Sequence, residues 1–282
     1  MAIKFKAKHY FSFSLALLCL LFYIFDQKLA VPFTRVGSNR NIIFKSDFEN
    51  ASFSGWASET CCRYSKTIVS SPVRSGNKAA RFELRKGTER SEVRQKRAKT
   101  NGEYWYGWSV LIPNDFVSDP SFDIISQFHD YQGSNNGWWG KAHRHLPLYF
   151  KTQNGNWYVR GTYQQYPNQK ITQTFVKNIG TYTKGKWTDF VVHAKWSYKS
   201  DGFIRVWKDG QLVFSKNGSV YYNLPQGPYL KVGIYKGDPD WPGSNNISDR
   251  VVYFDEIRIG GESAKYEDVA PHRRKLPWNL IS

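Results

Sequence analysis

From about residue 43 onward, the chain consists of short segments in which apolar and polar positions alternate. A period of two places successive side chains on opposite faces of a β-strand. Turn residues separate these segments, and the pair Asp209–Gly210 predicts a hairpin between residues 204 and 214. The sequence shows no long amphipathic helix and no repeat of fixed period. This pattern predicts an all-β fold, a sandwich or jelly roll of antiparallel strands.

The segment Gly227–Tyr235 separates most clearly into two faces. One face carries Tyr229, Lys231 and Tyr235, and the other carries only leucine, valine and isoleucine. Gly233 lies among the polar residues, where we expect it to leave open space beside them. A cation between two phenols suits the binding of an anionic, sugar-like ligand.

Two other segments, 89–95 and 124–130, show the same division. Their polar positions are Arg90, Glu92, Arg94, Gln127 and His129. In the second segment, Ile124, Ser126 and Phe128 are predicted to share the opposite face. If the three strands lie in one sheet, their polar faces meet in a concave, charged cleft.

The formal net charge of +17 indicates an anionic partner, which could be a nucleic acid, an anionic lipid or an acidic polymer. Aromatic residues make up 17% of the chain, which favours a folded β protein with exposed rings over a basic tail. The middle of the chain also contains a segment, 131–146, that is rich in rings and cations and predicts a binding loop. Its candidate ligand-binding residues are Trp138, Trp139, Lys141, His143 and His145.

Residues 1–30 have the features of an export signal, with lysines before an apolar run. The candidate cleavage site is poor because Lys28 stands where a small residue is expected, so an uncleaved membrane anchor is the alternative. Either outcome predicts a secreted or extracytoplasmic protein and argues against a nucleic-acid partner. A linker is predicted over 31–42, a single domain over 43–270 and a basic tail over 271–282.

Cys61 and Cys62 are adjacent in the sequence and have no other partner in the expected mature chain. Because neighbouring cysteines rarely bond to each other, we expect structural or free thiols. The cysteines and histidines show no metal-ligand spacing. We therefore expect no cofactor, with a structural calcium ion as the one metal left open. We also expect the protein to be a monomer.

The three polar segments, Arg90–Arg94, Gln127–His129 and Tyr229–Tyr235, resemble the motif strands of jelly-roll polysaccharide lyases that cleave alginate. The wider pattern is similar to the heparin lyase I-like and glucuronan lyase-like group, over roughly residues 43–270. The further segments that carry this resemblance are Gly102–Ser109, Gly185–His193, Asp201–Trp207 and Tyr253–Gly260. The resemblance implies a concanavalin A-like jelly roll and β-elimination on an acidic polysaccharide.

The resemblance also implies roles for individual residues. Arg90 or Arg94, together with Gln127, would bind the uronate carboxylate, and His129 and Tyr235 would act as base or acid. Lys231 and Tyr229 would contact the substrate, and Glu92 would orient the arginines. His143, His145 and His193 compete with His129 for the role of base, because related lyases do not all place the catalytic histidine in the same strand.

Two other functions remain open at this point. A non-catalytic module could bind an acidic polysaccharide on the same sandwich, because fold alone does not imply function. Such a module would need only cations and rings, whereas Gln127, His129 and Tyr235 are all present. A glycoside hydrolase would need paired carboxylates, but Asp255 and Glu256 are adjacent and would point to opposite faces.

Overall fold

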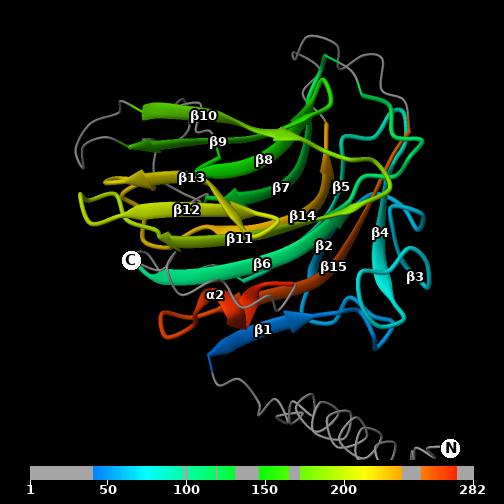
Figure 1. The fold of residues 1–282 in the computed structure, drawn as a ribbon, viewed down its shortest axis with the longest axis horizontal. Coiled ribbons are helices and arrows are strands. Elements are labelled where there is room, and N and C mark those ends of the chain that lie inside the picture. The colour runs from blue at the N-terminus through cyan, green and yellow to red at the C-terminus, as the bar shows by residue number, and fades with distance from the viewer. Residues whose placement is uncertain are drawn as a thin grey trace, which may run out of the picture. The chain divides into compact units, whose positions relative to one another are not determined.

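The structure is a computed structural model, and it describes residues 41–271 except 97, 99–100, 119, 131–145, 165–171 and 237–248. Within these residues there are two antiparallel sheets and one short helix, α2 (Tyr266–Val269) (Figure 1). The predicted all-β jelly-roll sandwich is confirmed.

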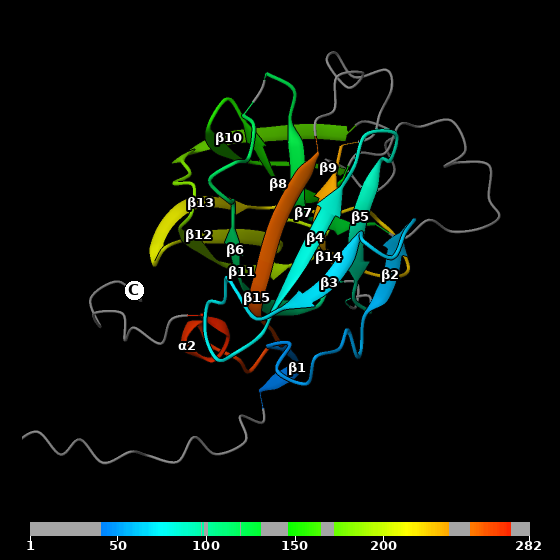
Figure 2. The same cartoon turned by 90° about the vertical axis from the view of Figure 1, so that its right-hand side faces the viewer.

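The eight-stranded sheet has the order β13-β12-β11-β6-β15-β4-β3, and β1 pairs with β15. Its strands are β1 (Ile42–Ser46), β3 (Lys66–Val69), β4 (Ala79–Leu84), β6 (Glu103–Leu111), β11 (Trp187–Lys195), β12 (Phe203–Lys208), β13 (Gln211–Asn217) and β15 (Arg250–Gly260). Figure 2 shows β15, β4 and β3 side by side.

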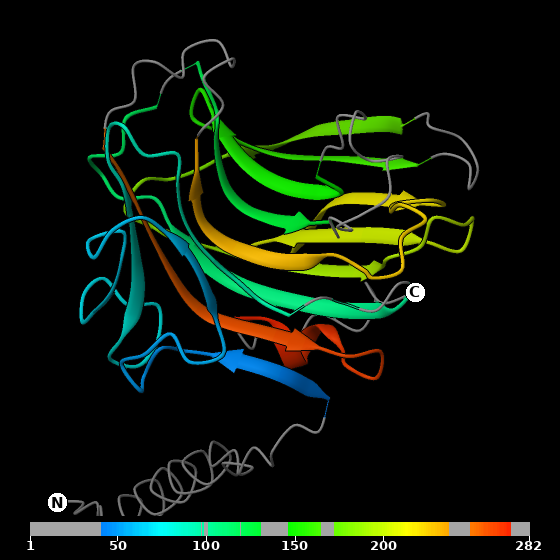
Figure 3. The same cartoon turned by 180° about the vertical axis from the view of Figure 1, so that it is seen from behind.

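The seven-stranded sheet has the order β10-β9-β8-β7-β14-β5-β2. Its strands are β2 (Ala57–Thr60), β5 (Arg90–Arg94), β7 (Asp123–His129), β8 (Leu148–Gln153), β9 (Asn156–Gln164), β10 (Thr172–Thr181) and β14 (Tyr229–Tyr235). The long strands of both sheets, β6 and β14 among them, bend in the same sense (Figure 3).

The main hydrophobic core is built from the inward faces of both sheets. Trp108 of β6 meets Phe150 of β8 with ring centroids 5.1 Å apart in an edge-to-face contact. Trp196, just after β11, contacts Phe128 of β7 at 4.9 Å. Burial of such large rings provides most of the driving force for folding, because the hydrophobic effect scales with the apolar area removed from water.

The hairpin predicted at Asp209–Gly210 is confirmed between β12 and β13. Both turn residues have positive φ, 51° for Asp209 and 83° for Gly210, as a tight hairpin turn requires. On the outer face of the eight-stranded sheet, Gly107 of β6 allows α2 to pack closely. A Cβ atom at Gly107 would lie 1.9 Å from the carbonyl oxygen of Val269.

Candidate active site

The register of β14 brings the three predicted polar faces together. β14 lies between β5 and β7, and Lys231 is directly opposite Arg94 on one side and Gln127 on the other. Tyr229 is opposite His129. Residues that face each other across a ladder project from the same side of the sheet. The alternate residues of these strands, such as Val93 and Phe128, belong to the core, so the polar face is the outer one.

Along this face, the two tyrosines of β14 have different neighbours. The ring of Tyr229 is stacked on His129, with centroids 5.3 Å apart and an interplanar angle of 20°. Arg94 lies over the same ring at 5.5 Å. Tyr235 is instead opposite Arg90, whose guanidinium lies 4.9 Å from its ring centroid. The two tyrosines are six residues apart, up to about 20 Å along an extended strand, so the structure brings Tyr229 to His129 and leaves Tyr235 at the other end.

The imidazole of His129 is oriented by the residue that follows it. Its Nδ1 atom lies 3.1 Å from the backbone oxygen of Asp130 and 3.3 Å from the Asp130 carboxylate. A proton on Nδ1 satisfies both acceptors, which leaves Nε2 as the nitrogen that can accept a proton. This is the arrangement a general base needs.

A carboxylate that the sequence analysis did not identify lies at the centre of the cations. Glu59 on β2 is opposite Glu92 on β5. Its oxygens lie 2.6 Å from Lys231 Nζ, 3.1 Å from Arg94 Nε and 3.4 Å from the Arg90 guanidinium. Arg90 and Arg94 are thus oriented by Glu59, a role that was expected for Glu92.

Glu92 is 1% exposed, and its carboxylate accepts a hydrogen bond from Gln127 and lies 3.5 Å from Lys231 Nζ. Burial raises the pKa of Glu92, although the Lys231 charge and the Gln127 hydrogen bond act in the opposite direction. For Glu59, burial also tends to raise the pKa, but the hydrogen bond and charge of Lys231, followed by the Arg90 charge, lower it below its ordinary value. Lys231 is 2% exposed at its side chain, so its ammonium serves these two carboxyl groups rather than the open surface.

Two expectations about the faces of these strands are wrong. Gly233 does not leave open space, because a Cβ atom there would lie 2.1 Å from the backbone oxygen of Ser91; its φ of 135° accompanies a change of register between β14 and β7. β7 also changes register against β8 between Ile124 and Ser126. As a result Ile125, rather than Ile124, joins the core, and Ile124 lies opposite Tyr235.

His193 is not brought to this face. It lies on β11 of the eight-stranded sheet, where Phe190 and Val192 point into the core and His193 therefore points outward. Its ring stacks on Trp105 at 3.7 Å, and its Nε2 atom lies 2.7 Å from the Glu103 carboxylate. Burial lowers the pKa of His193, against the opposing effect of Glu103. These contacts give it a packing role away from the candidate active site.

Several predictions concern parts of the chain outside the described residues. They are the export signal, most of the linker, nearly all of the basic tail, and the loop residues Trp138, Trp139, Lys141, His143 and His145. In the described part of the chain, no helix is long and apolar enough to cross a membrane. Among these same residues, no group of three or more histidine, cysteine, aspartate or glutamate side chains could hold a metal ion.

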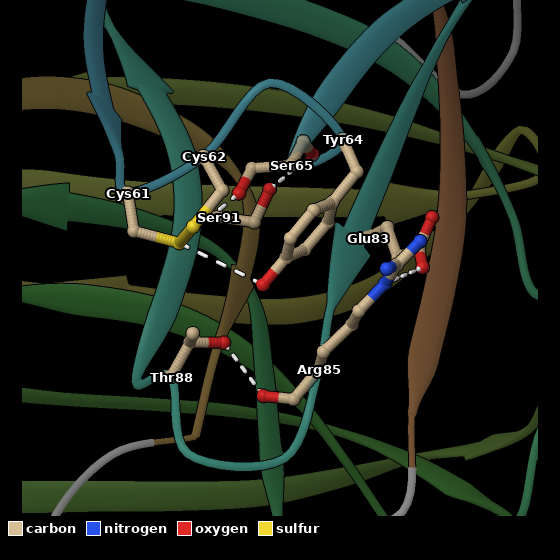
Figure 4. The surroundings of a disulfide bond; sticks show 8 residues. All are labelled: Cys61, Cys62, Tyr64, Ser65, Glu83, Arg85, Thr88 and Ser91. Atoms are coloured by element: carbon tan, nitrogen blue, oxygen red, sulfur yellow. Dashed lines mark hydrogen bonds and ion pairs between the residues drawn. A yellow bond between two sulfur atoms is a disulfide. The ribbon is translucent and has the colours of Figure 1, made fainter.

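The expectation of structural or free thiols is wrong, because Cys61 and Cys62 form a disulfide with each other (Figure 4). The pair directly follows β2, two residues after Glu59. The Sγ atom of Cys61 lies 3.5 Å from the Ser65 hydroxyl and 3.8 Å from the Tyr64 hydroxyl. The disulfide therefore belongs to the turn that connects the Glu59 strand to β3.

The polar face continues onto β8 and β9, which the sequence analysis did not assign to the site. Tyr149 and Lys151 of β8 lie opposite Arg160 and Tyr158 of β9, respectively. The signal was present as alternation, since Phe150 and the other residues between these positions are buried in the core. What the sequence did not show is that β8 is the neighbour of β7.

Comparisons with known proteins agree with this fold. A family model described as polysaccharide lyase matches residues 48–258. The search of curated proteins gives no match. An endo-β-1,4-glucuronan lyase from the fungus Trichoderma reesei has a similar structure, with a TM-score of 0.69 and 20% identity over 83% of this chain and 100% of that chain.

Two further structures are similar at lower scores. The cellulose-induced protein Cip1 has a TM-score of 0.51 and 14% identity, over 77% of this chain and 96% of that chain. The alginate lyase Aly36B has a TM-score of 0.50 and 15% identity, over 74% of this chain and 88% of that chain. At these identities the similarity shows a shared fold.

Proposed function

Because this chain belongs to the polysaccharide lyase family, we propose that it cleaves a uronate-containing polysaccharide by β-elimination. The observation that carries the proposal is the contact of His129 with Tyr229, beside Gln127 and Arg94, on one outer face of the sheet. β-1,4-Glucuronan is the first substrate to test, because the fungal glucuronan lyase shares the fold over its whole length.

β-Elimination requires three groups around the scissile bond. The C5 proton of a uronate becomes removable only when the charge that develops on its carboxylate is stabilised, a term that is often the largest in such reactions. Arg94 is the charged hydrogen-bond donor nearest to the His129–Tyr229 pair by register. Gln127 is the nearest neutral donor, and one of its two amide hydrogens is used in the hydrogen bond to Glu92. We assign carboxylate recognition to them.

His129 is the base in this proposal, and Tyr229 is the acid. Nε2 of His129 removes the C5 proton, the released electron pair forms the C4–C5 double bond, and the C4–O4 bond breaks. The Tyr229 hydroxyl gives its proton to O4 of the leaving chain. The two rings are stacked nearly parallel with centroids 5.3 Å apart, which places the proposed base and acid side by side.

The test is a panel of acidic polymers that includes glucuronan, alginate, other polyuronates and sulfated glycosaminoglycans. Elimination produces a C4–C5 double bond next to the carboxylate, which is measured by near-ultraviolet absorbance. The proposal expects absorbance to rise with at least one polyuronate. If the protein binds a polymer but no absorbance develops on any, it is a binding module instead. The expected export signal adds the proposal that the protein acts outside the cytoplasm.

A further inference from the structure

The outer face of the seven-stranded sheet extends beyond the proposed catalytic pair. Tyr149 on β8 lies opposite Gln127 on β7 and opposite Arg160 on β9. Lys151, also on β8, lies opposite Tyr158. Opposed residues share a face, so two cations and two phenol rings continue the candidate active site across the strands.

Among the described residues, these two cations have no carboxylate counter-charge, unlike those around Glu59. Within the described residues, neither Lys151 nor Arg160 forms an ion pair with a carboxylate. Lys151 Nζ donates to the side-chain oxygen of Gln153 at 2.7 Å, and the Arg160 guanidinium lies 6.0 Å from the centroid of the Tyr149 ring. Neither of these two contacts supplies a negative charge.

The two cations also act on each other. Burial and the Arg160 charge together lower the pKa of Lys151. Lys151 is 7% exposed and Arg160 is partly exposed, so water screens the repulsion between these like charges only in part, and an anion placed between them removes that repulsion. The pair is therefore poised to bind a negatively charged group.

The surroundings suit a sugar ring as well as a charge. Lys151 lies 5.0 Å from the centroid of the Tyr158 ring, so an aromatic surface borders the cation. On β10, Val176 lies opposite Arg160 and is 61% exposed. Aromatic and apolar surface next to a cation can pack against the carbon-bound hydrogens of a uronate while the cation holds its carboxylate.

We infer that Lys151 and Arg160, with Tyr149 and Tyr158, form a second carboxylate subsite for a uronate residue farther along the polymer. This inference rests on the proposed function. Neighbouring strands are about 4.8 Å apart, so Arg160 is two strands, roughly 10 Å, from Gln127. The polymer crosses the strands from β14 toward β10, because the cations on the β5 side are already shared by Glu59 and Glu92.

The test compares Arg160→Gln and Lys151→Gln with the unchanged protein, using glucuronan and its oligomers. We expect KM for the polymer to rise roughly tenfold or more for each variant, the loss typical of one hydrogen bond to a charged group. Turnover at saturation changes little, because the catalytic pair is untouched. The difference should disappear for the shortest oligomers that are still cleaved, since these do not reach the subsite. Arg160→Lys, which keeps the charge, should recover part of the affinity.

Matched controls come from the eight-stranded sheet. Lys216 of β13 lies 4.0 Å from the Tyr163 ring centroid, and burial lowers its pKa as it does for Lys151. Arg205 of β12 lies 4.7 Å from the Phe203 ring centroid. Lys216→Gln and Arg205→Gln should leave KM unchanged. Unfolding temperatures of all variants show whether a change in KM reflects loss of folded protein.

A binding measurement separates the subsite from the reaction. In a His129→Ala background, the dissociation constant for glucuronan, measured by calorimetry, should rise by the same factor on Arg160→Gln. If the protein cleaves glucuronan but both KM and this constant are unchanged, the subsite inference is overturned and the proposed function stands. If the protein binds glucuronan without cleaving it and the substitution weakens binding, the subsite stands and the elimination proposal fails. Absence of both binding and cleavage for every polyuronate tested overturns both.

Discussion

Tyr229 and Tyr235 share a strand and a face, but their surroundings give them different chemistry. Tyr229 has the His129 ring stacked on it, with Gln127 and Arg94 in the next register position. Tyr235 lies among Arg90 and the apolar Ile124. A general acid must be near the base that works on the same sugar residue, and of these two tyrosines Tyr229 is the one that meets that condition.

Replacing Tyr229 with phenylalanine removes the hydroxyl and keeps the packing of the ring. We expect Tyr229→Phe to fold normally, to bind polymer and to lose at least about 10²-fold in kcat, the low end for general acid–base catalysis. Tyr235→Phe should lose less. The measurement is the initial rate of double-bond formation on the same polymer. A larger loss for Tyr235→Phe would restore the assignment that the resemblance alone implied.

Glu59 gives a second prediction at this scale. Glu59→Gln keeps the shape of the side chain but releases Arg90 and Arg94 and raises the net charge of the site by one. We expect KM for an acidic polymer to fall, because attraction increases, and kcat to fall roughly tenfold, because the arginines lose a charge-assisted hydrogen bond that orients them. A simple loss of stability would not move the two constants in this way. Glu83→Gln is the control, since Glu83 also bridges two arginines, Arg81 and Arg85, but on the other sheet.

The difference in stability between the unchanged protein and Glu59→Gln should depend on pH in a defined direction. The pKa of Glu59 is lowered in the folded protein from its ordinary value of 4.5. Its charge therefore contributes stability that is fully present above pH 4.5 and is lost as the pH falls through the lowered value. The difference in unfolding temperature between the two proteins should be largest near neutral pH and shrink in acid. A constant difference down to acid pH would argue against the ion-pair account.

At the scale of elements, a buried ion group holds the ends of three strands together. Asp123 begins β7, Lys236 follows β14 and Arg250 begins β15. The Asp123 carboxylate lies 3.2 Å from Lys236 Nζ and 3.2 Å from Arg250 Nε, and all three side chains are at most 3% exposed. Buried charges of this kind depend on one another, because a lone ion in the interior has lost its hydration.

Replacing Asp123 with asparagine should therefore cost about 3–5 kcal/mol in the free energy of unfolding, because it removes the charge of one member of a buried ion group. Urea denaturation measures this loss. The control is Asp201→Asn, which breaks an exposed ion pair with Lys195 and should cost no more than about 1 kcal/mol. Equal effects of the two substitutions would show that the buried group does not anchor β7 and β14.

At the scale of the whole molecule, 40 lysine and arginine residues against 23 aspartate and glutamate residues produce a strongly positive field. Such a field attracts an acidic polymer to a face whose own cations are partly neutralised by Glu59 and Glu92. Long-range attraction and local recognition therefore have different sources in this protein.

Salt should weaken the long-range part first. Exposed charges are screened over about 10 Å at 0.1 M ionic strength and about 3 Å at 1 M. We expect KM for glucuronan to rise steeply with sodium chloride while kcat changes much less. The measurement is steady-state kinetics over a salt series at constant pH. A KM that does not respond to salt would mean that hydrogen bonds and rings, rather than charge, hold the polymer.

The sequence by itself determined the strands and the faces of most of them, because alternation is a local property that burial imposes on every half-buried strand. It also determined that Arg94, Gln127, His129 and Tyr229 would be outward-facing. It failed at Ile124, since a change of register reverses the face of a strand and leaves no mark in the local pattern. The Cys61–Cys62 bond was also missed. Neighbouring cysteines rarely bond to each other, but this general preference does not determine whether the backbone of one particular turn allows the bond.

Only the tertiary structure decided which residues act together. Glu59 lies on a four-residue edge strand without a clear apolar face, and nothing local connects it to cations 31 to 172 positions away. Lys151 and Arg160 join the site because β8 and β9 continue the sheet beside β7. His193 leaves it because β11 belongs to the other sheet. Strand order and register arise from packing and hydrogen bonds between distant segments, and these contacts determine which charges neutralise each other and which tyrosine meets the histidine.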